Sequence, residues 1–262
     1  MEPQEKQQPE MFSREWYNEY FRRAVSSPTH SRFCEQVYGI DLCQHGLMDS
    51  DELDFLTSLF DASQHVLEIG CSNGFVTETI HDRTGCSLLG IDYSDIAIEQ
   101  ARERTFHKNG LTFECLDLTK DPLPQGPFDV ILLVDSLYFL GELSDTIQKI
   151  LPSLSVEGSL VLSVFQIKGE EDAEESLLPE NTWLAQALEE IGLTYHWFDF
   201  TENVQRHGIL NYTIAEQLKE DFYQEGNGFL YEARAAENHY FKQAAEEQSI
   251  VRYMYKTSTK AN

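Results

Sequence analysis

Basic residues are few in this chain of 262 amino acids. It carries 19 lysines and arginines against 45 aspartates and glutamates, which gives a formal net charge of −26. A surface of this sign repels a phosphate backbone, so nucleic acid is excluded as an expected partner. An acidic surface is also an ordinary means of staying dissolved, so the charge excludes more than it identifies.

Long hydrophobic runs are also missing. No window approaches the roughly 18 uninterrupted apolar residues of a membrane span, and residues 1–10 are polar and acidic, unlike a signal or transit peptide. We therefore expect a cytoplasmic protein without a membrane partner, with a disordered tail at 1–10. The remainder, 11–262, has the length of a single elaborated domain and requires no second core.

Cysteine is scarce and shows no pairing pattern. The five cysteines are odd in number, and no two of them form a C-x-x-C pair. The pattern indicates neither a disulfide framework nor a zinc site, and no cluster of His, Asp and Glu suggests another metal. We expect the cysteines to be small buried residues.

The third glycine of a dinucleotide-binding turn is absent. A short apolar strand at 66–69 leads into a turn whose small residues are Gly70, Ser72 and Gly74. A dinucleotide site requires G-x-G-x-x-G, and the third position here is Phe75, which is too large for close packing of helix on strand. The turn therefore predicts a nucleotide-type ligand other than NAD.

Acidic residues follow the next predicted strands. Asp92 ends the second apolar run, about 20 residues after the turn, where nucleotide-binding α/β folds place the acid that takes the two ribose hydroxyls. Asp117 and Leu118 follow a third run at 111–116, and a fourth, fully buried run begins at 128 and ends at Asp135. Ligands of open α/β sheets bind where such strand ends meet.

The turn, preceded by Glu68, and the acids after the following strands resemble the motifs of class I S-adenosylmethionine (SAM) methyltransferases, over roughly 46–200. The resemblance implies an α/β fold with a seven-stranded, mostly parallel sheet flanked by helices. It also implies SAM as the cofactor and S-adenosylhomocysteine (SAH) as the product. The residues it places around SAM are Glu68, Gly70, Ser72, Gly74, Asp92, Tyr93, Asp117, Leu118 and Asp135, with Tyr38 and His45 as candidates at its methionine end. In an alternative interpretation, Asp92 only caps a helix and Asp117 only makes a turn.

Two N-terminal helices are predicted ahead of the first strand, within a cap at 11–60. One carries aromatic residues on a single face, which are either core or a cover for the ligand; these are Trp16, Tyr17, Tyr20 and Phe21. The other begins at an imperfect capping box at Ser50 and runs to Phe60.

A helical insertion is predicted before the last strand. A strand at 194–200 and an antiparallel last strand at 250–256 are separated by residues 201–249, far more than the ~2–5 residues of a hairpin loop. The insertion is rich in aromatic residues and predicts helices at 213–223 and 229–247. Rings with polar tips suit a lid that holds an organic acceptor and excludes water, although they also suit plain packing of the lid.

Methyl transfer from SAM is an in-line displacement that depends mainly on alignment. A base is required only when the acceptor arrives protonated, and the candidates are Tyr138, His207 and His239. The loop 135–138 reads Asp-Ser-Leu-Tyr and lacks the Asn/Asp-Pro-Pro-Tyr motif of amide methyltransferases. We predict methylation of a small molecule at N, O or C. Acidic surroundings and aromatic faces favour a cationic or amine acceptor.

Other functions stay open at this level. They are a protein methyltransferase, another SAM-using enzyme such as an aminopropyltransferase, and a non-catalytic SAM-binding subunit that activates a partner. An aromatic lid favours an enzyme, whereas a partner subunit is expected to carry an exposed apolar patch. The sequence identifies neither the acceptor nor the oligomeric state.

Overall fold

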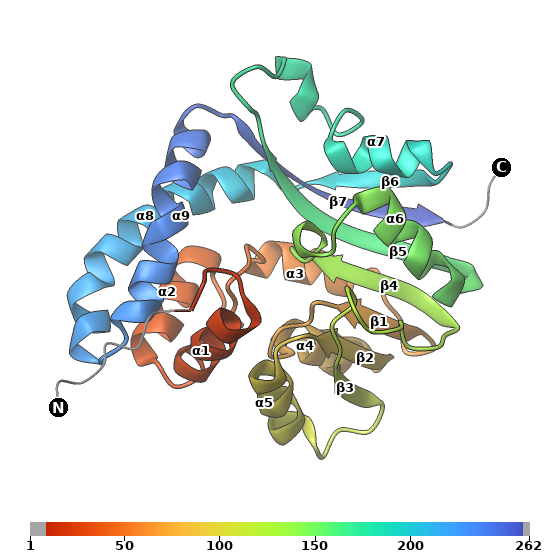
Figure 1. Cartoon of the computed structure of the whole chain (residues 1–262), viewed down its shortest axis with the longest axis horizontal. Helices are drawn as coiled ribbons and strands as arrows, with labels where there is room; N and C mark the ends of the chain where they lie inside the picture. Colours follow the sequence, from red (N-terminus) through yellow and green to blue (C-terminus); the bar gives the residue numbers. More distant parts are fainter. Residues whose placement is uncertain (1–8, 259–262) are drawn as a thin grey trace.

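A computed structural model describes residues 9–258. They form a seven-stranded sheet with the order β3-β2-β1-β4-β5-β7-β6 (Figure 1). Neighbouring strands are parallel except at β7, which runs antiparallel to both β5 and β6. The strands are β1 (His65–Ile69), β2 (Ser87–Asp92), β3 (Leu111–Cys115), β4 (Phe128–Val134), β5 (Leu154–Ile167), β6 (Thr194–Asp199) and β7 (Ile250–Ser258). The predicted sheet, with its antiparallel last strand and a reversal of order beside Gly70, is confirmed.

Helices cover both faces of the sheet, because alternate side chains of each buried strand point to opposite sides. Leu67 and Ile131 pack with α6 and α7, whereas their neighbours Val66 and Val130 pack with α3, α4 and α5. These helices are α3 (Ser50–Thr57), α4 (Phe75–Thr84), α5 (Asp95–Thr105), α6 (Leu143–Ile150) and α7 (Trp183–Glu190). Burial on both faces explains why these strands read as continuous apolar runs.

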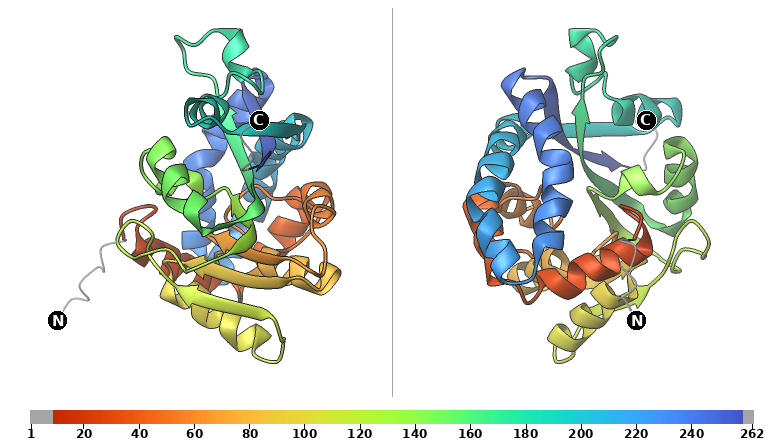
Figure 2. Two further views of the ribbon diagram at one scale, coloured as in Figure 1. Left: turned by 90° about the vertical axis from the view of Figure 1, so that its right-hand side faces the viewer. Right: turned by 60° about the vertical axis from the view of Figure 1, so that its left-hand side comes forward.

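Four more helices form a cap beyond the C-terminal ends of the parallel strands (Figures 1 and 2). They are α1 (Arg14–Ala24), α2 (Pro28–Tyr38), α8 (Thr201–Gln224) and α9 (Gly228–Glu246). The cap has a hydrophobic cluster of its own, in which Tyr20, Phe33 and Phe222 are fully buried. The N-terminal helical cap and the helical insertion before the last strand are therefore present, and they pack on each other.

The long helix α8 begins at Thr201, well before the predicted start at 213. Gly208 lies inside it and lowers its intrinsic helix propensity. The glycine has a packing reason, since a Cβ there would lie 2.7 Å from the backbone oxygen of Phe241 on α9. Close contact between the two helices thus overrides local propensity.

Two features near the N-terminus differ from the sequence interpretation. The cap of α3 is Asp49 and not Ser50: its carboxylate accepts the backbone N–H of Glu52 at 2.8 Å, and the helix ends at Thr57 rather than Phe60. Helix α2 was not predicted. Its signals are a capping serine before the proline at its first position, and a left-handed glycine after its last residue.

Within the described residues, no helix is long and apolar enough to cross a membrane. All but the last two residues of the tail predicted at 1–10 lie outside the described part of the chain. The five cysteines are free thiols; four of them are buried, as expected, and Cys115 is only partly buried.

Candidate active site

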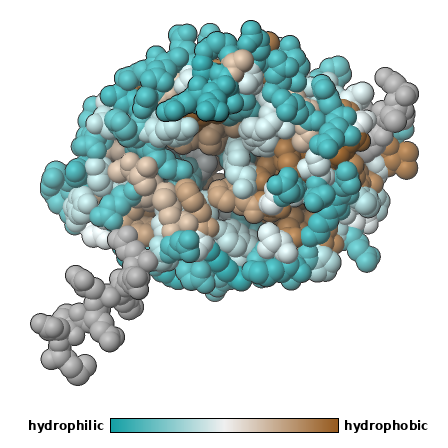
Figure 3. Space-filling view, turned by 45° about the horizontal axis from the view of Figure 1, so that its top comes forward, coloured by the Kyte–Doolittle hydropathy of each residue, from teal (hydrophilic) through white to brown (hydrophobic). Residues whose placement is uncertain are grey.

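A cavity of about 650 Å³ lies between the C-terminal ends of the parallel strands and the cap. This is within the range of about 300–1,000 Å³ that small-molecule pockets occupy. Hydrophobic residues gather around a hollow on the face shown in Figure 3. Every predicted cofactor residue lines the cavity except Gly74, which is instead the N-cap of α4 and has a left-handed conformation.

The glycine turn brings bare backbone to the cavity. Gly70 has a φ of +78°, and its N–H donates to the carbonyl of Ile91 at 2.8 Å. A Cβ at this position would overlap the Cβ of Ser136, whose hydroxyl donates to the carbonyl of Ile69 at 2.8 Å. Glycine is therefore required here both by the backbone conformation and by the close approach of the loop after β4.

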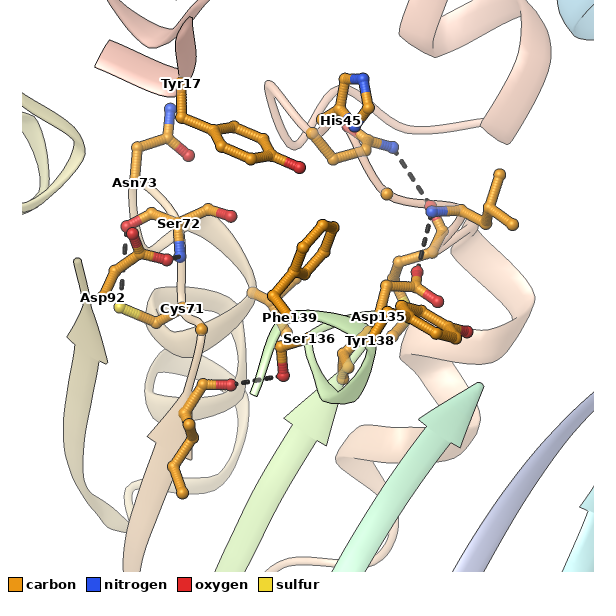
Figure 4. A pocket seen from close by; sticks show the side chains of 18 of the residues that line it. Tyr17, His45, Cys71, Ser72, Asn73, Asp92, Asp135, Ser136, Tyr138 and Phe139 are labelled. Carbon is orange, nitrogen blue, oxygen red and sulfur yellow. Dashed lines mark hydrogen bonds between the residues drawn. The ribbon is translucent and has the colours of Figure 1, made fainter. Parts of the chain in front are cut away.

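Asp92 ends β2 beside this turn (Figure 4). Its two carboxylate oxygens accept the backbone N–H groups of Ser72 at 2.9 Å and Ser94 at 2.8 Å. Burial raises its pKa to about 6, although both hydrogen bonds act in the opposite direction. A carboxylate has about four lone-pair sites, so each oxygen keeps one for a further donor.

The remaining acids of the sequence pattern have different surroundings. Glu68 is buried and accepts the hydroxyl of Thr77 at 2.5 Å, and burial raises its pKa to about 7. Asp117 accepts the backbone N–H of Thr119 at 3.1 Å and pairs with Lys120 at 2.6 Å, which lowers its pKa. Its carboxylate is thus held in its own turn, as in the alternative interpretation, although Asp117 and the adjacent Leu118 line the cavity.

Asp135 is held by a buried arginine that the sequence motifs do not include. Arg252 of β7 is fully buried and donates to both Asp135 oxygens, at 2.6 and 3.1 Å. The Nε of Arg252 also donates to Glu52 of α3 at 2.8 Å, and the backbone N–H of Leu47 donates to Asp135 at 2.9 Å. Asp135 therefore lines the cavity. Through these contacts it also connects the end of β4 to β7, to α3 and to the cap loop, which is the loop between α2 and α3.

The three candidate bases are not brought together. Tyr138 lines the cavity, but its hydroxyl accepts the backbone N–H of Phe165 at 2.7 Å, and desolvation of that hydroxyl holds its pKa well above its ordinary value. His207 is buried away from the cavity wall, with its Nε2 3.0 Å from the carboxylate of Asp49. His239 is exposed and also does not line the cavity.

The cap supplies aromatic walls. Tyr38 is buried, and its hydroxyl donates to Oδ1 of Asn211 on α8 at 3.0 Å; the hydroxyl of Tyr93 donates to the backbone of Phe12 at 3.1 Å. His45 meets Trp16, Tyr17 and Tyr20 edge to face, with ring centroids 5.1 to 5.8 Å away. Burial lowers the pKa of His45 well below its ordinary value, so the ring is neutral. Figure 4 shows Tyr17 and His45, which belong to the cap, above Asp135, Tyr138 and Phe139 of the loop after β4.

Residues 66–158 match a family model described as a methyltransferase domain. Malonyl-[acyl-carrier protein] O-methyltransferase of Acetivibrio thermocellus is 30% identical over 120 residues, which cover 45% of this chain and 40% of that protein. The match thus spans less than half the length of this relative.

Solved structures with the same fold cover nearly the whole chain. Haemonchus contortus phosphoethanolamine N-methyltransferase 2, in complex with phosphomonomethylethanolamine and SAH, aligns with a TM-score of 0.68 and 14% identity over 92% of this chain and 59% of that one. The [4+2]-cyclase SpnF aligns with a TM-score of 0.69 and 18% identity over 95% and 97%. At these identities the likeness establishes the fold.

Residues 66–158 are therefore similar to a methyltransferase domain, and the chain as a whole has the fold of solved methyltransferases that bind SAM or SAH. SAM is the cofactor that this family uses. The resemblance drawn from the glycine turn and the strand-end acids is confirmed at this level.

Proposed function

We propose that this protein transfers the methyl group of SAM to a small-molecule acceptor at N, O or C. The observation that carries the proposal is the meeting of Gly70, Ser72 and Asp92 on one side of a cavity that the aromatic cap covers. The cavity is roofed by α1 and by the α8–α9 insertion, which favours a small acceptor over a protein chain. It also favours an enzyme over a partner subunit.

The residues present fit SAM. Asp92 retains acceptor sites that would take two ribose hydroxyls, the side-chain-free Gly70 would allow close approach of the ligand, and Leu118 with Asp117 would border the adenine. When bound, SAM supplies an activated methyl group. The chain must then align the acceptor and exclude water. The rings of Tyr17 and Phe139 on the cavity wall favour the exclusion of water.

The proposal is tested by calorimetry with SAH together with a screen of metabolite acceptors using radiolabelled SAM. We expect SAH to bind and label to pass to at least one metabolite. Absence of SAH binding would contradict the proposal. SAH binding without transfer to any acceptor in a broad screen would favour the partner-subunit alternative.

Replacing Gly70 by alanine should weaken SAH binding roughly tenfold or more, because the turn must shift away from Ser136. Gly192 offers a matched control, since it has nearly the same φ, +77°, but a Cβ there would meet nothing within 4 Å. Gly192→Ala should cost only the backbone strain, about 1–2 kcal/mol of stability, and leave SAH affinity unchanged. Equal SAH affinity in both variants would contradict the assigned role of the turn.

The affinity for SAH should fall as the pH drops below about 6, because a protonated Asp92 is a poorer acceptor for hydroxyl groups. In the ligand-free protein, the effect of pH on the stability of the fold has the opposite sign. The raised pKa of Asp92 stabilises the fold at low pH, and this contribution is lost as the pH rises from about 4 to about 6. Calorimetric titrations with SAH between about pH 5 and pH 8 measure the predicted fall in SAH affinity. Asp92→Asn should remove the step, and a step of unchanged size in that variant would assign it to another group.

A further inference from the structure

Five carboxylates line the cavity, and four of them already have partners or a place in the proposed cofactor site. The fifth is Glu237 on α9. No described residue donates a hydrogen bond to it, and its nearest cationic or imidazole nitrogen is Nε2 of His45 at 3.8 Å. It is the one carboxylate that the described part of the cap contributes to the cavity wall.

The position of Glu237 follows from the helical repeat of α9. Arg234, Glu237, Asn238 and Phe241 are spaced i, i+3, i+4 and i+7, so they share one face of the helix, and all four line the cavity. The face thus presents a carboxylate, an amide and a ring to the cavity.

The neighbouring cation does not neutralise Glu237 by direct pairing. The guanidinium of Arg234 donates to the hydroxyl of Tyr20 at 2.9 Å, to the backbone oxygen of His45 at 2.8 Å and to that of Gln44. It therefore holds the Gln44–His45 segment in place over the cavity. Its charge lowers the pKa of Glu237, but burial outweighs it and leaves that pKa raised.

The other titratable groups near Glu237 provide no positive charge. They are Tyr17 of α1, whose raised pKa keeps it a neutral phenol, and His45 of the cap loop, which is neutral because its pKa is lowered. The Nε2 of His45 is buried without a hydrogen-bond partner among the described residues. A partly desolvated carboxylate with no donor is costly unless a cation joins it.

Aromatic rings around the same cavity suit such a cation. Tyr17, Phe139, Phe165 and Phe241 all line the cavity, and an ammonium group gains from aromatic faces as well as from a carboxylate. We propose that Glu237 binds the protonated nitrogen of an amine acceptor and then takes its proton. The inference rests on the proposed methyl transfer and names the acceptor class for that site.

The reaction balances as follows. A proton passes from the ammonium nitrogen to a carboxylate oxygen of Glu237, which leaves a lone pair on nitrogen. That pair forms the new bond to the methyl carbon, and the bond from the methyl carbon to sulfur breaks with its electron pair staying on sulfur. The products are SAH and the methylated ammonium, and Glu237 returns its proton to water.

The test compares three probes of similar shape on protein saturated with SAH, so that no turnover occurs. They are 2-(dimethylamino)ethanol, its neutral isostere 3-methylbutan-1-ol, and the anion 3-methylbutanoate, each titrated by ligand-observed NMR near neutral pH. The wild-type protein should bind the amine at least roughly tenfold more tightly than the alcohol, and the anion least tightly.

Two variants assign the effect. Glu237→Gln keeps the shape of the side chain and should abolish the preference for the amine while SAH affinity stays unchanged. Glu220→Gln removes the same charge from an exposed position on α8 and should keep the preference. Any general effect of net charge would appear equally in both variants.

Equal binding of amine and alcohol by the SAH-bound wild-type protein overturns the role of Glu237 alone. So does a preference for the amine that survives in Glu237→Gln. Binding of 3-methylbutanoate more tightly than the amine also overturns it, and would indicate that Arg234 rather than Glu237 sets the charge preference of this part of the cavity. Failure of the wild-type protein to bind SAH is a different result, because it overturns the proposed methyl transfer itself.

Discussion

Replacing Arg252 by methionine should lower the free energy of unfolding by about 3–5 kcal/mol, the range found when one partner of a buried ion pair is removed. Arg252 is fully buried, and its two partners are nearly so: the side chains of Glu52 and Asp135 are 1% and 11% exposed. Without the guanidinium, two buried carboxylates face each other uncompensated. Urea unfolding followed by circular dichroism measures the loss.

Controls separate this effect from a general loss of an arginine. Arg83→Met breaks an exposed pair with Asp54, whose side chains are 41% and 68% exposed, so it should cost no more than about 1 kcal/mol. Adding Glu52→Gln and Asp135→Asn to Arg252→Met removes both uncompensated charges and should recover part of the stability. A single Arg252→Met variant as stable as Arg83→Met would show that the buried network contributes little.

Replacing Asp92 by alanine should weaken SAH binding by about 2–4 kcal/mol, because two hydrogen bonds to a charged acceptor are lost, each worth about 1.5–3 kcal/mol before water partly replaces them. The measurement is calorimetric titration with SAH at neutral pH. Asp145→Ala, in the exposed first turn of α6, serves as the matched control and should bind SAH as the wild type does. Unchanged affinity in a folded Asp92→Ala variant would remove Asp92 from the cofactor site.

The sheet and the cofactor half of the site could be predicted from the sequence because their signals are local. Buried parallel strands read as apolar runs, and the turn at Gly70 needs small residues within a few positions of each other. The acid at Asp92 follows from strand order, since the ends of adjacent parallel strands meet at one edge. Such patterns can be recognised in the sequence without knowledge of tertiary contacts.

The acceptor half could not be predicted because it depends on contacts between distant segments. Arg252 meets Asp135 across 117 positions and Glu52 across 200, and no spacing rule links them. The helical period of α9 groups Arg234 with Glu237, but only packing on α1 and α8 decides that this face lines the cavity. The histidines singled out by chemistry alone, His207 and His239, lie elsewhere for the same reason.

The place of β7 between β5 and β6 has a consequence for the growing chain. β7 is the last of the described strands in chain order, yet it is the only partner of β6 and the outer partner of β5 in the described sheet. Until residues 250–258 emerge, both older strands present open edges of the kind that promote aggregation. Arg252 arrives with the same segment, so the described sheet and the anchor of Asp135 are completed together. A nascent chain stopped at the end of α9 should therefore be a substrate for chaperones and proteases rather than a partly active enzyme.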